Sequence, residues 1–168
     1  MIKKLILSTL LLCGLAHAAP SSAPSSTLDA VLERGVLRVG FDAGYQPFEM
    51  TNKQGQYIGF DVDLAKMVAK EMGVKVEFVN TAWDGIIPAL NARKFDFLIA
   101  SMSITEERKA AVDFTEPYYT NKLQFIAPKG GDFKVDKASL KGKVIGAQRA
   151  TIAGTWLEDN LNGVVDIK

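Results

Sequence analysis

The hydrophobic pattern that follows residue 26 predicts a short helix and then a strand. In residues 28–34, hydrophobic side chains recur at the spacing of one helix face. We expect Thr27 to cap this helix and Gly35 to end it, because these residue types are favoured at those positions. Residues 36–41, VLRVGF, are largely apolar, which is typical of a buried strand.

Predicted helices and strands continue to alternate along the chain up to residue 100. Asp61 is expected to cap an amphipathic helix that ends at Gly73. Residues 74–79, VKVEFV, alternate as a strand, and residues 84–92 form a short helix. Residues 97–100 are the next apolar strand.

This order of elements predicts an α/β fold with a parallel sheet. Residues 48–50 and 57–59 flank the polar stretch TNKQGQ, which adds a hairpin. Ligands of parallel α/β sheets bind beyond the carboxyl ends of the strands. The segments that matter for function are therefore residues 42–45, 81–83 and 101–108.

The N-terminus has the order of a secretory signal peptide. Two lysines precede the apolar run LILSTLLLCGLA, and Ala-His-Ala follows at residues 16–18 as a cleavage signal. A retained membrane anchor is the first alternative, but the run is shorter than the roughly 20 apolar residues that span a bilayer. A lipid-modified Cys13 is the second, and bulky Leu12 before it argues against this. We expect residues 1–18 to be removed and residues 19–26 to be a flexible lead-in.

Composition narrows the function further. The chain has 168 residues, and its 48% hydrophobic and 23% charged residues are typical of a globular protein. The net charge of +1 provides no basic surface for phosphates, so nucleic acid is not expected as a partner. Cleavage would remove the single Cys and the single His. The mature chain could then form neither a His-dependent nucleophilic site nor a Cys/His zinc site.

The segment SMSITEER, residues 101–108, holds the sharpest group of candidate ligand residues. If the segment is extended, Ser101 and Ser103 point to the same side. Thr105 can cap the next helix, which places Arg108 in its first turn. Hydroxyls, free amide groups and a guanidinium together favour a carboxylate. The alternative is that Thr105 only caps the helix while Arg108 is solvated or pairs with Glu107.

Two other segments follow predicted strands. Asp42 could face an ammonium or amide group of a ligand, and Tyr45 could lie against an aliphatic side chain. The alternative is that Asp42 caps a turn and Tyr45 covers the edge of the core. Trp83 is either a wall of the same site or a core residue.

The segments GFDVDLAKMVAKEMG, WDGIIPALNARKFDFLIASMSITEERK and VDFTEPYY resemble the polar amino acid-binding family of periplasmic solute-binding proteins, which serve ABC importers. The chain is similar to the glutamine-, histidine- and lysine/arginine/ornithine-binding members. The resemblance implies a type II periplasmic binding protein, in which two α/β lobes joined by two crossing strands close on a ligand. Residues 27–117 would be the N-terminal part of lobe one, residues 118–122 the first hinge strand and residues 123–168 the start of lobe two.

Family members continue well beyond Lys168. We therefore expect a C-terminally truncated chain with an incomplete lobe two, whose short length leaves little hydrophobic core to order it. Within it, residues 143–147 are expected to form a strand and a helix to begin near Ala153. Residues 164–167 would be a strand with unpaired neighbours.

The resemblance also implies roles for the candidate residues. Arg108 would hold the ligand α-carboxylate in a bidentate pair, with Ser103 supplying a hydroxyl. Ser101 and Ala100 would line the same wall. Asp61 matches a recurring family residue whose expected role is helix capping.

The side chain of the ligand would meet three other residues. Tyr45 and Trp83 would sandwich it, and Asp42 would reach its head group. In the loop that contains Gln148, Thr151 and Ile152, backbone amides would approach the α-carboxylate. Many relatives have Gly in place of Ala150, and Ile152 carries no hydroxyl. The alternative for this loop is an ordinary strand-to-helix turn.

The function implied by the resemblance is that of a periplasmic, monomeric binding protein, not an enzyme, which needs no cofactor or metal. It would deliver a polar, basic amino acid to the membrane permease of an ABC importer. Lysine, arginine or ornithine is the expected ligand, followed by glutamine or histidine. The alternatives on the same fold are a periplasmic cyclohexadienyl or arogenate-type dehydratase, the ectodomain of a receptor, and a murein-processing enzyme.

Overall fold

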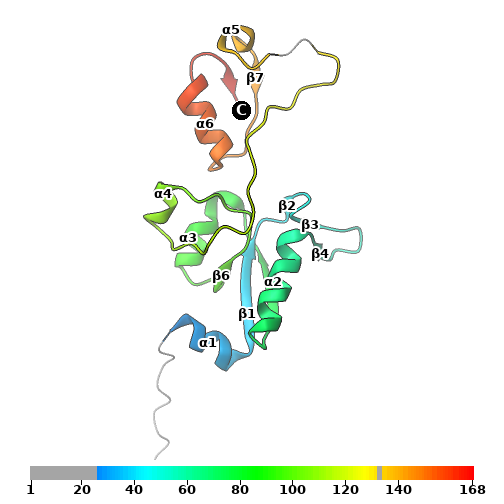
Figure 1. Cartoon of the computed structure of the whole chain (residues 1–168), viewed down its shortest axis with the longest axis vertical. Helices are drawn as coiled ribbons and strands as arrows, with labels where there is room; N and C mark the ends of the chain where they lie inside the picture. The colour runs from blue at the N-terminus through cyan, green and yellow to red at the C-terminus, as the bar shows by residue number, and fades with distance from the viewer. Residues whose placement is uncertain (1–25, 132–133) are drawn as a thin grey trace, which may run out of the picture.

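The structure is a computed structural model that describes residues 26–131 and 134–168 (Figure 1). The expected signal peptide, and the lead-in up to residue 25, lie outside the described residues. The elements in chain order are α1 (Thr27–Arg34), β1 (Val36–Phe41), β2 (Gly44–Tyr45), β3 (Glu49–Thr51), β4 (Tyr57–Ile58), α2 (Phe60–Glu71), β5 (Lys75–Asn80), η1 (Trp83–Gly85), α3 (Ile86–Asn91), β6 (Phe97–Leu98), α4 (Glu106–Lys109), α5 (Lys137–Leu140), β7 (Val144–Ile145), α6 (Ile152–Leu161) and β8 (Asp166–Ile167). We call the part from α1 to α4 the first unit and the part from α5 to β8 the second unit.

The first unit is built on a parallel sheet with the strand order β5-β1-β6. All of β1 pairs with β5, and Val39 of β1 lies opposite Phe97 of β6. The predicted α/β fold with a parallel sheet is confirmed. The strand predicted at residues 97–100 is shorter than expected, because beyond Leu98 a single hydrogen bond from Ile99 to Gly40 continues the ladder.

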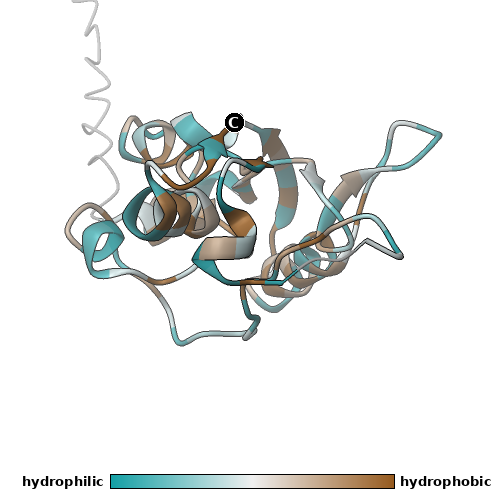
Figure 2. Ribbon diagram, turned by 90° about the horizontal axis from the view of Figure 1, so that it is seen from above, coloured by the Kyte–Doolittle hydropathy of each residue, from teal (hydrophilic) through white to brown (hydrophobic). Residues whose placement is uncertain are grey.

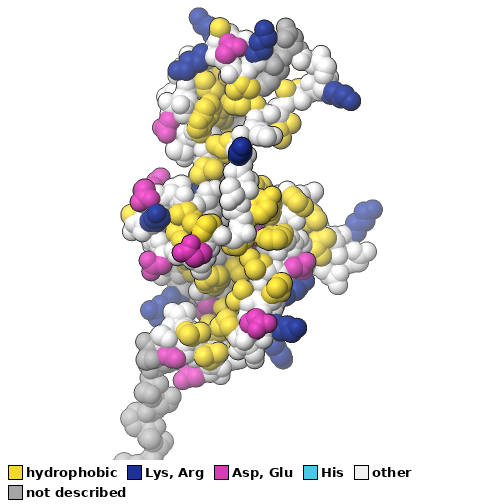
Figure 3. All heavy atoms as spheres, in the orientation of Figure 1, with side chains coloured by type: hydrophobic (Ala, Val, Ile, Leu, Met, Phe, Trp, Pro, Cys, Tyr) yellow, Lys and Arg dark blue, Asp and Glu magenta, His cyan; other side chains and the backbone are white. Residues whose placement is uncertain are grey.

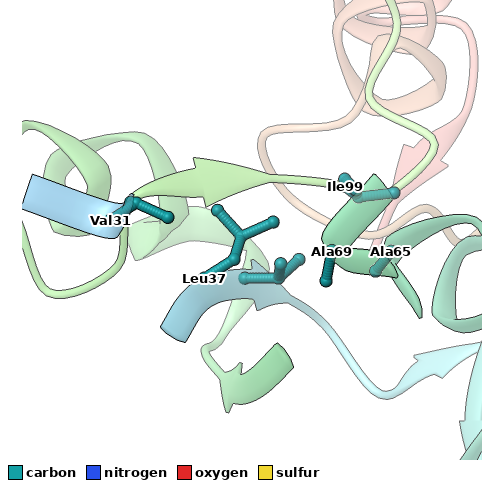
Figure 4. Packing of buried hydrophobic residues seen from close by; sticks show 6 residues of the cluster. Val31, Leu37, Ala65, Ala69 and Ile99 are labelled. Atoms are coloured by element: carbon teal, nitrogen blue, oxygen red, sulfur yellow. The ribbon is translucent and has the colours of Figure 1, made fainter. Parts of the chain in front are cut away.

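The core of the first unit lies around β1, and Figure 4 shows part of it. Ala65 and Ala69 of α2 are small, so the helix approaches the sheet closely. This cluster consists of Val31, Leu37, Val39, Ala65, Ala69 and Ile99. A second cluster, closer to the carboxyl end of β1, consists of Phe41, Val62, Ile86, Ala89, Phe95 and Ala100. Figure 2 shows the hydrophobic segments gathered toward the middle of the molecule.

Two expected helix caps are wrong. Ser26, not Thr27, caps α1: its backbone is extended and its hydroxyl accepts a hydrogen bond from the Asp29 amide. Helix α2 begins after Gly59 without a side-chain cap. Asp61 cannot cap α2 because its side chain is buried and accepts a hydrogen bond from the Tyr118 hydroxyl at 3.1 Å. Gly35 ends α1 as predicted, with a φ of 67°.

The predicted hairpin is present as the antiparallel sheet β2-β3-β4. Gly59 joins this sheet to α2 with a φ of 129°, a region that residues with a side chain rarely adopt. A Cβ atom at this position would lie 2.3 Å from the carbonyl oxygen of Phe48. The tight turn therefore requires glycine.

The second unit has a small core of its own, formed by Leu140, Leu157, Leu161 and Val165. The strand expected at residues 143–147 is reduced to β7. The prediction that residues 164–167 lack paired neighbours is wrong, because β8 pairs with β7 in parallel. Helix α6 begins at Ile152, one residue before the predicted start. No helix within residues 26–131 and 134–168 is long and apolar enough to cross a membrane.

The connection between the units differs from the prediction. Residues 118–122, the expected hinge strand, are not in a strand. The physical reason is that a strand requires a neighbouring ladder, and no segment of the described chain pairs with these residues. Figure 1 shows them as an extended segment, and Figure 3 shows the two units as separate masses that meet at a narrow waist.

The turn at Gly59 provides a test of the packing. We expect Gly59→Ala to lower the free energy of unfolding by more than about 2 kcal/mol, because it combines backbone strain with a clash. Gly85→Ala is the matched control: a Cβ there meets nothing within 4 Å, and we expect a change below about 1 kcal/mol. Urea unfolding of both variants measures the difference, and equal effects would contradict the account of the turn.

Candidate functional site

A cavity of about 440 Å³ lies between the two units. Its wall comes from the ends of strands in the first unit, from the connecting segment and from the start of α6. All of the predicted site residues except Arg108 line it, namely Asp42, Tyr45, Trp83, Ala100, Ser101, Ser103, Gln148, Thr151 and Ile152. The remaining lining residues, which the sequence did not single out, are Gly44, Glu49, Asn121, Leu123 and Ala153. The tertiary structure thus brings together segments that lie more than a hundred positions apart.

Arg108 lies beside this cavity rather than in its wall. As predicted, Thr105 caps α4, and its hydroxyl accepts a hydrogen bond from the Arg108 amide. The guanidinium lines a neighbouring cavity of about 450 Å³, and Trp83 and Ile152 line both cavities. Burial lowers the pKa of Arg108 from its ordinary value. The side chain is therefore turned into the molecule, and the alternative of a solvated arginine paired with Glu107 is not what the structure contains.

The guanidinium of Arg108 joins the two units. It donates one hydrogen bond to the carbonyl of Ser103 at 2.8 Å and another to the carbonyl of Ala150 at 2.9 Å. Its central carbon lies 5.5 Å from the ring centroid of Trp83. The indole of Trp83 donates to the same Ala150 carbonyl at 2.9 Å. One carbonyl of the second unit thus accepts from two side chains of the first.

The loop before α6 has an unusual backbone. Ala150 adopts a φ of 58°, in the left-handed region, which residues with a side chain rarely adopt. The Thr151 hydroxyl caps α6 by accepting from the Gly154 amide and donates to the Gln148 carbonyl at 2.7 Å. Gln148 in turn donates to the Asp42 carboxylate at 3.2 Å. The loop is a strand-to-helix turn that also forms one wall of the cavity.

Asp42 and Tyr45 reach the cavity from the end of β1 and from β2. The carboxylate of Asp42 faces the second unit through its bond with Gln148, so it does not serve as a turn cap. The ring of Tyr45 stacks on Phe48 at a centroid distance of 5.2 Å. The Tyr45 hydroxyl accepts from the amide of Asn121 at 3.4 Å, which links it to the connecting segment.

Ser101 and Ser103 both line the cavity, as predicted, but they do not lie in a fully extended segment. Ser101 has a φ of 45°, so the segment is not extended at this position. The Ser101 amide donates to the Tyr118 hydroxyl at 2.9 Å. Its own hydroxyl oxygen is buried and has no hydrogen-bond partner among the described residues.

Glu49 is the most important residue that the sequence reasoning missed. It is 0% exposed, although it lines the cavity, and its Oε2 atom has no hydrogen-bond partner in the described chain. The only sequence signal was an acidic residue at the first position of a short strand, which is uninformative by itself. Its burial depends on α2 covering the hairpin.

The two buried carboxyl groups at the cavity, those of Glu49 and Asp61, both have raised pKa values. Burial, and then the negative charge of Asp61, raise the pKa of Glu49 to about 8, and the backbone amide of Asp42 opposes this. Burial also raises the pKa of Asp61, while the hydrogen bond from the Tyr118 hydroxyl opposes the shift. No group of three or more metal-binding side chains occurs among residues 26–131 and 134–168.

Comparison with known proteins decides the family. Residues 37–158 match the family described as bacterial extracellular solute-binding proteins, family 3. The chain belongs to this family. The matched range contains both the parallel sheet and the start of α6, so it includes every wall of the cavity.

Individual relatives agree with this assignment. The chain is 41% identical over 125 residues to the L-arginine-binding protein of Pseudomonas aeruginosa, with 74% of this chain and 48% of the relative covered. A solved structure of an ancestral amino acid-binding protein, described as a precursor of cyclohexadienyl dehydratase, matches with a TM-score of 0.79 and 45% identity. That match covers 85% of this chain and 64% of the ancestral one. The arginine-bound form of domain 1 from TmArgBP matches with a TM-score of 0.53 and 46% identity, covering 54% of this chain and 71% of that one.

These matches establish the type of fold and show how much of each relative this chain covers. The family 3 protein described here has the α/β architecture of type II amino acid-binding proteins. It spans about half the length of the L-arginine-binding relative.

The buried Glu49 predicts a pH dependence of stability. Because the folded state holds the Glu49 proton more tightly than the unfolded state, folding takes up protons between pH of about 4.5 and about 8. The contribution of Glu49 to the free energy of unfolding should therefore fall as pH rises through this interval, by at most about 1.4 kcal/mol per unit.

Denaturant unfolding of Glu49→Gln against the natural chain checks this prediction. The variant should gain stability relative to the natural chain as pH rises from 5 to 8, because Gln cannot ionise. Glu71→Gln, at an exposed position of α2, is the control and should show no such trend. A constant difference between Glu49→Gln and the natural chain would show that Glu49 titrates normally.

Proposed function

We propose that this protein captures a basic amino acid in the periplasm and delivers it to the membrane permease of an ABC importer. The cavity between the two units carries the proposal. Two acidic residues, Asp42 and Glu49, line it and no Lys or Arg does, while the cationic Arg108 lies next to it. A zwitterion with a cationic side chain is the ligand that matches acidic groups at one end and a guanidinium at the other.

We assign the α-carboxylate of the ligand to Arg108. Its guanidinium now donates to the carbonyl of Ala150, and its ring contact with Trp83 keeps it next to the cavity. A carboxylate is a stronger acceptor than a carbonyl and can take two bonds from the same fork. Ser103, Ser101 and Ala100 would line this end, and the first amides of α6, after Thr151, would complete it.

The ligand side chain would extend toward Asp42. Tyr45 and Trp83 line the cavity and would cover its aliphatic part, while Asp42 would pair with its cationic head. Gln148, which donates to Asp42 in this structure, would contribute from the second unit.

The proposed function includes a role for each segment of the chain. Residues 1–18 act as a signal peptide for export, and residues 19–26 form the lead-in. Residues 27–117 belong to lobe one, residues 118–122 to the hinge and residues 123–168 to lobe two. Ligand contacts in both lobes favour the closed form, which the permease recognises. The protein acts as a monomer.

We place most of the affinity in the first lobe. The support comes from domain 1 of TmArgBP, which is described as arginine-bound and which matches 54% of this chain. The proposed role is binding without chemistry, and the description of the family as solute-binding proteins supports it.

Titration calorimetry of the purified protein with each of the twenty amino acids and ornithine tests the proposal. We expect arginine, lysine or ornithine to bind most tightly, with glutamine and histidine weaker. Binding of none of these ligands would refute the proposed function, and tight binding of an acidic or purely apolar amino acid would refute the basic ligand.

Variants at position 108 test the carboxylate site. Arg108→Ala should weaken binding by about 2–5 kcal/mol, or roughly 30-fold or more, because it removes a paired charge. Arg108→Lys should restore only part of this, because lysine lacks the planar fork. Lys109→Ala is the matched control: its ammonium pairs with Glu106 on the surface, and its removal should change affinity by less than about twofold. Unchanged affinity in Arg108→Ala would refute the assignment.

A further inference from the structure

Three buried polar atoms without hydrogen-bond partners lie in or near the wall of the cavity. Glu49 and Asp61 are 0% and 1% exposed, the lowest values for charged residues in the described chain. Oε2 of Glu49, Oδ2 of Asp61 and Oγ of Ser101 lack hydrogen-bond partners among the described residues. Of these, Glu49 and Ser101 line the cavity itself. A buried polar atom without a partner costs free energy, so a ligand that completes its bonding is favoured.

The charges that act on Glu49 come from two elements, and a third element contacts one of them. Asp42, at the end of β1, offers its backbone amide to Glu49 Oε1 at 3.4 Å, and its carboxylate adds negative charge. Asp61, from α2, adds a second negative charge. Tyr118, from the connecting segment, donates to Asp61, and burial raises the pKa of its hydroxyl, so it stays neutral. The charges that act on Glu49 are thus all negative, and none of them stabilises its ionised form.

A cation in the cavity would favour the ionised form of Glu49 instead of the protonated form. An opposite charge at 4–6 Å lowers the pKa of a carboxyl group by about one to three units. Starting from about 8, that shift moves the pKa of Glu49 to neutral pH or below. A ligand with a neutral side chain has no such effect and can instead accept a hydrogen bond from the protonated carboxyl.

We propose that Glu49 senses the charge of the ligand side chain by releasing a proton when a cationic side chain occupies the cavity. The O–H bond of the Glu49 carboxyl breaks, its proton leaves to the solvent, and the resulting carboxylate pairs with the ligand cation. Charge is conserved, and no other reactant is needed. The inference rests on the proposed function and adds to it a residue that selects the ligand by charge.

The proton release sets the pH dependence of binding. Below the pKa of free Glu49, a cationic ligand must displace the proton, so its affinity rises with pH by at most tenfold per unit and levels off above pH of about 8. A ligand of the same shape with a neutral side chain binds to protonated Glu49, and its affinity does not rise over this range. Arginine and citrulline form such a pair, and both carry the same α-amino group.

Calorimetry at pH 7 in phosphate and in Tris, which differ in their enthalpy of ionisation, measures the protons released. With a pKa that falls from about 8 by one to three units, we expect arginine to release about 0.4 to 0.9 proton per site, and citrulline to release close to none. In Glu49→Gln, which keeps the shape and neutrality of the protonated acid, the release with arginine should fall to near zero. Glu71→Gln should release as much as the natural chain, and circular dichroism verifies that both variants are folded.

The outcomes test the role of Glu49 and the proposed function separately. Arginine binding without proton release, or with equal release from Glu49→Gln and the natural chain, would overturn the role of Glu49 and leave the proposed function standing. Equal release with arginine and citrulline would also overturn it, since the proton would then not report side-chain charge. Failure to bind any amino acid would refute the proposed function itself.

Discussion

Burial of β1 between β5 and β6 is the constraint on which the rest of this structure depends. Because the three strands are parallel, their carboxyl ends lie at one edge of the sheet, and the segments that follow them meet there. Asp42, Trp83 and Ser101 reach one cavity for this reason alone. The two hydrophobic clusters around β1 hold that edge rigid, which a binding site requires if it is to select among similar ligands.

The same burial explains the unusual electrostatics beneath the cavity. Once α2 packs against the sheet through Ala65 and Ala69, Asp61 at its start is drawn inside, next to Glu49. Two carboxyl groups without a cation between them cannot both ionise at low cost. The fold thus places Glu49, whose pKa is raised to about 8, in the wall of a site whose proposed ligand is a cation, and that ligand would bring a positive charge next to it.

Contact between the two units depends on a few polar groups rather than on a shared core. The Ala150 carbonyl accepts from both Trp83 and Arg108, Gln148 donates to Asp42, and Arg149 pairs with Asp84 at 3.1 Å. Each unit keeps its own hydrophobic cluster. Polar contacts of this kind can be exchanged for ligand groups at little cost, which suits the proposed closure of the two units on a ligand.

Local pattern by itself determined the elements of this protein: the helix before Gly35, the buried strand β1, the hairpin and the cap at Thr105 follow from spacing and residue type. Five residues of the cavity could be named from their places after strands, namely Asp42, Tyr45, Trp83, Ser101 and Ser103. The others that were named, Ala100, Gln148, Thr151 and Ile152, followed only from the resemblance to the family. Only the tertiary structure decided which groups are buried together. Asp61 has the sequence signature of a cap, yet packing turns it inward, and Ser101 leaves the extended conformation through a left-handed backbone angle. Residues 118–122 form no strand because pairing depends on a neighbour, not on their own composition. Arg108 was predicted to lie in the wall of the cavity, and its hydrogen bonds to two carbonyls, which no local pattern encodes, hold it beside that wall.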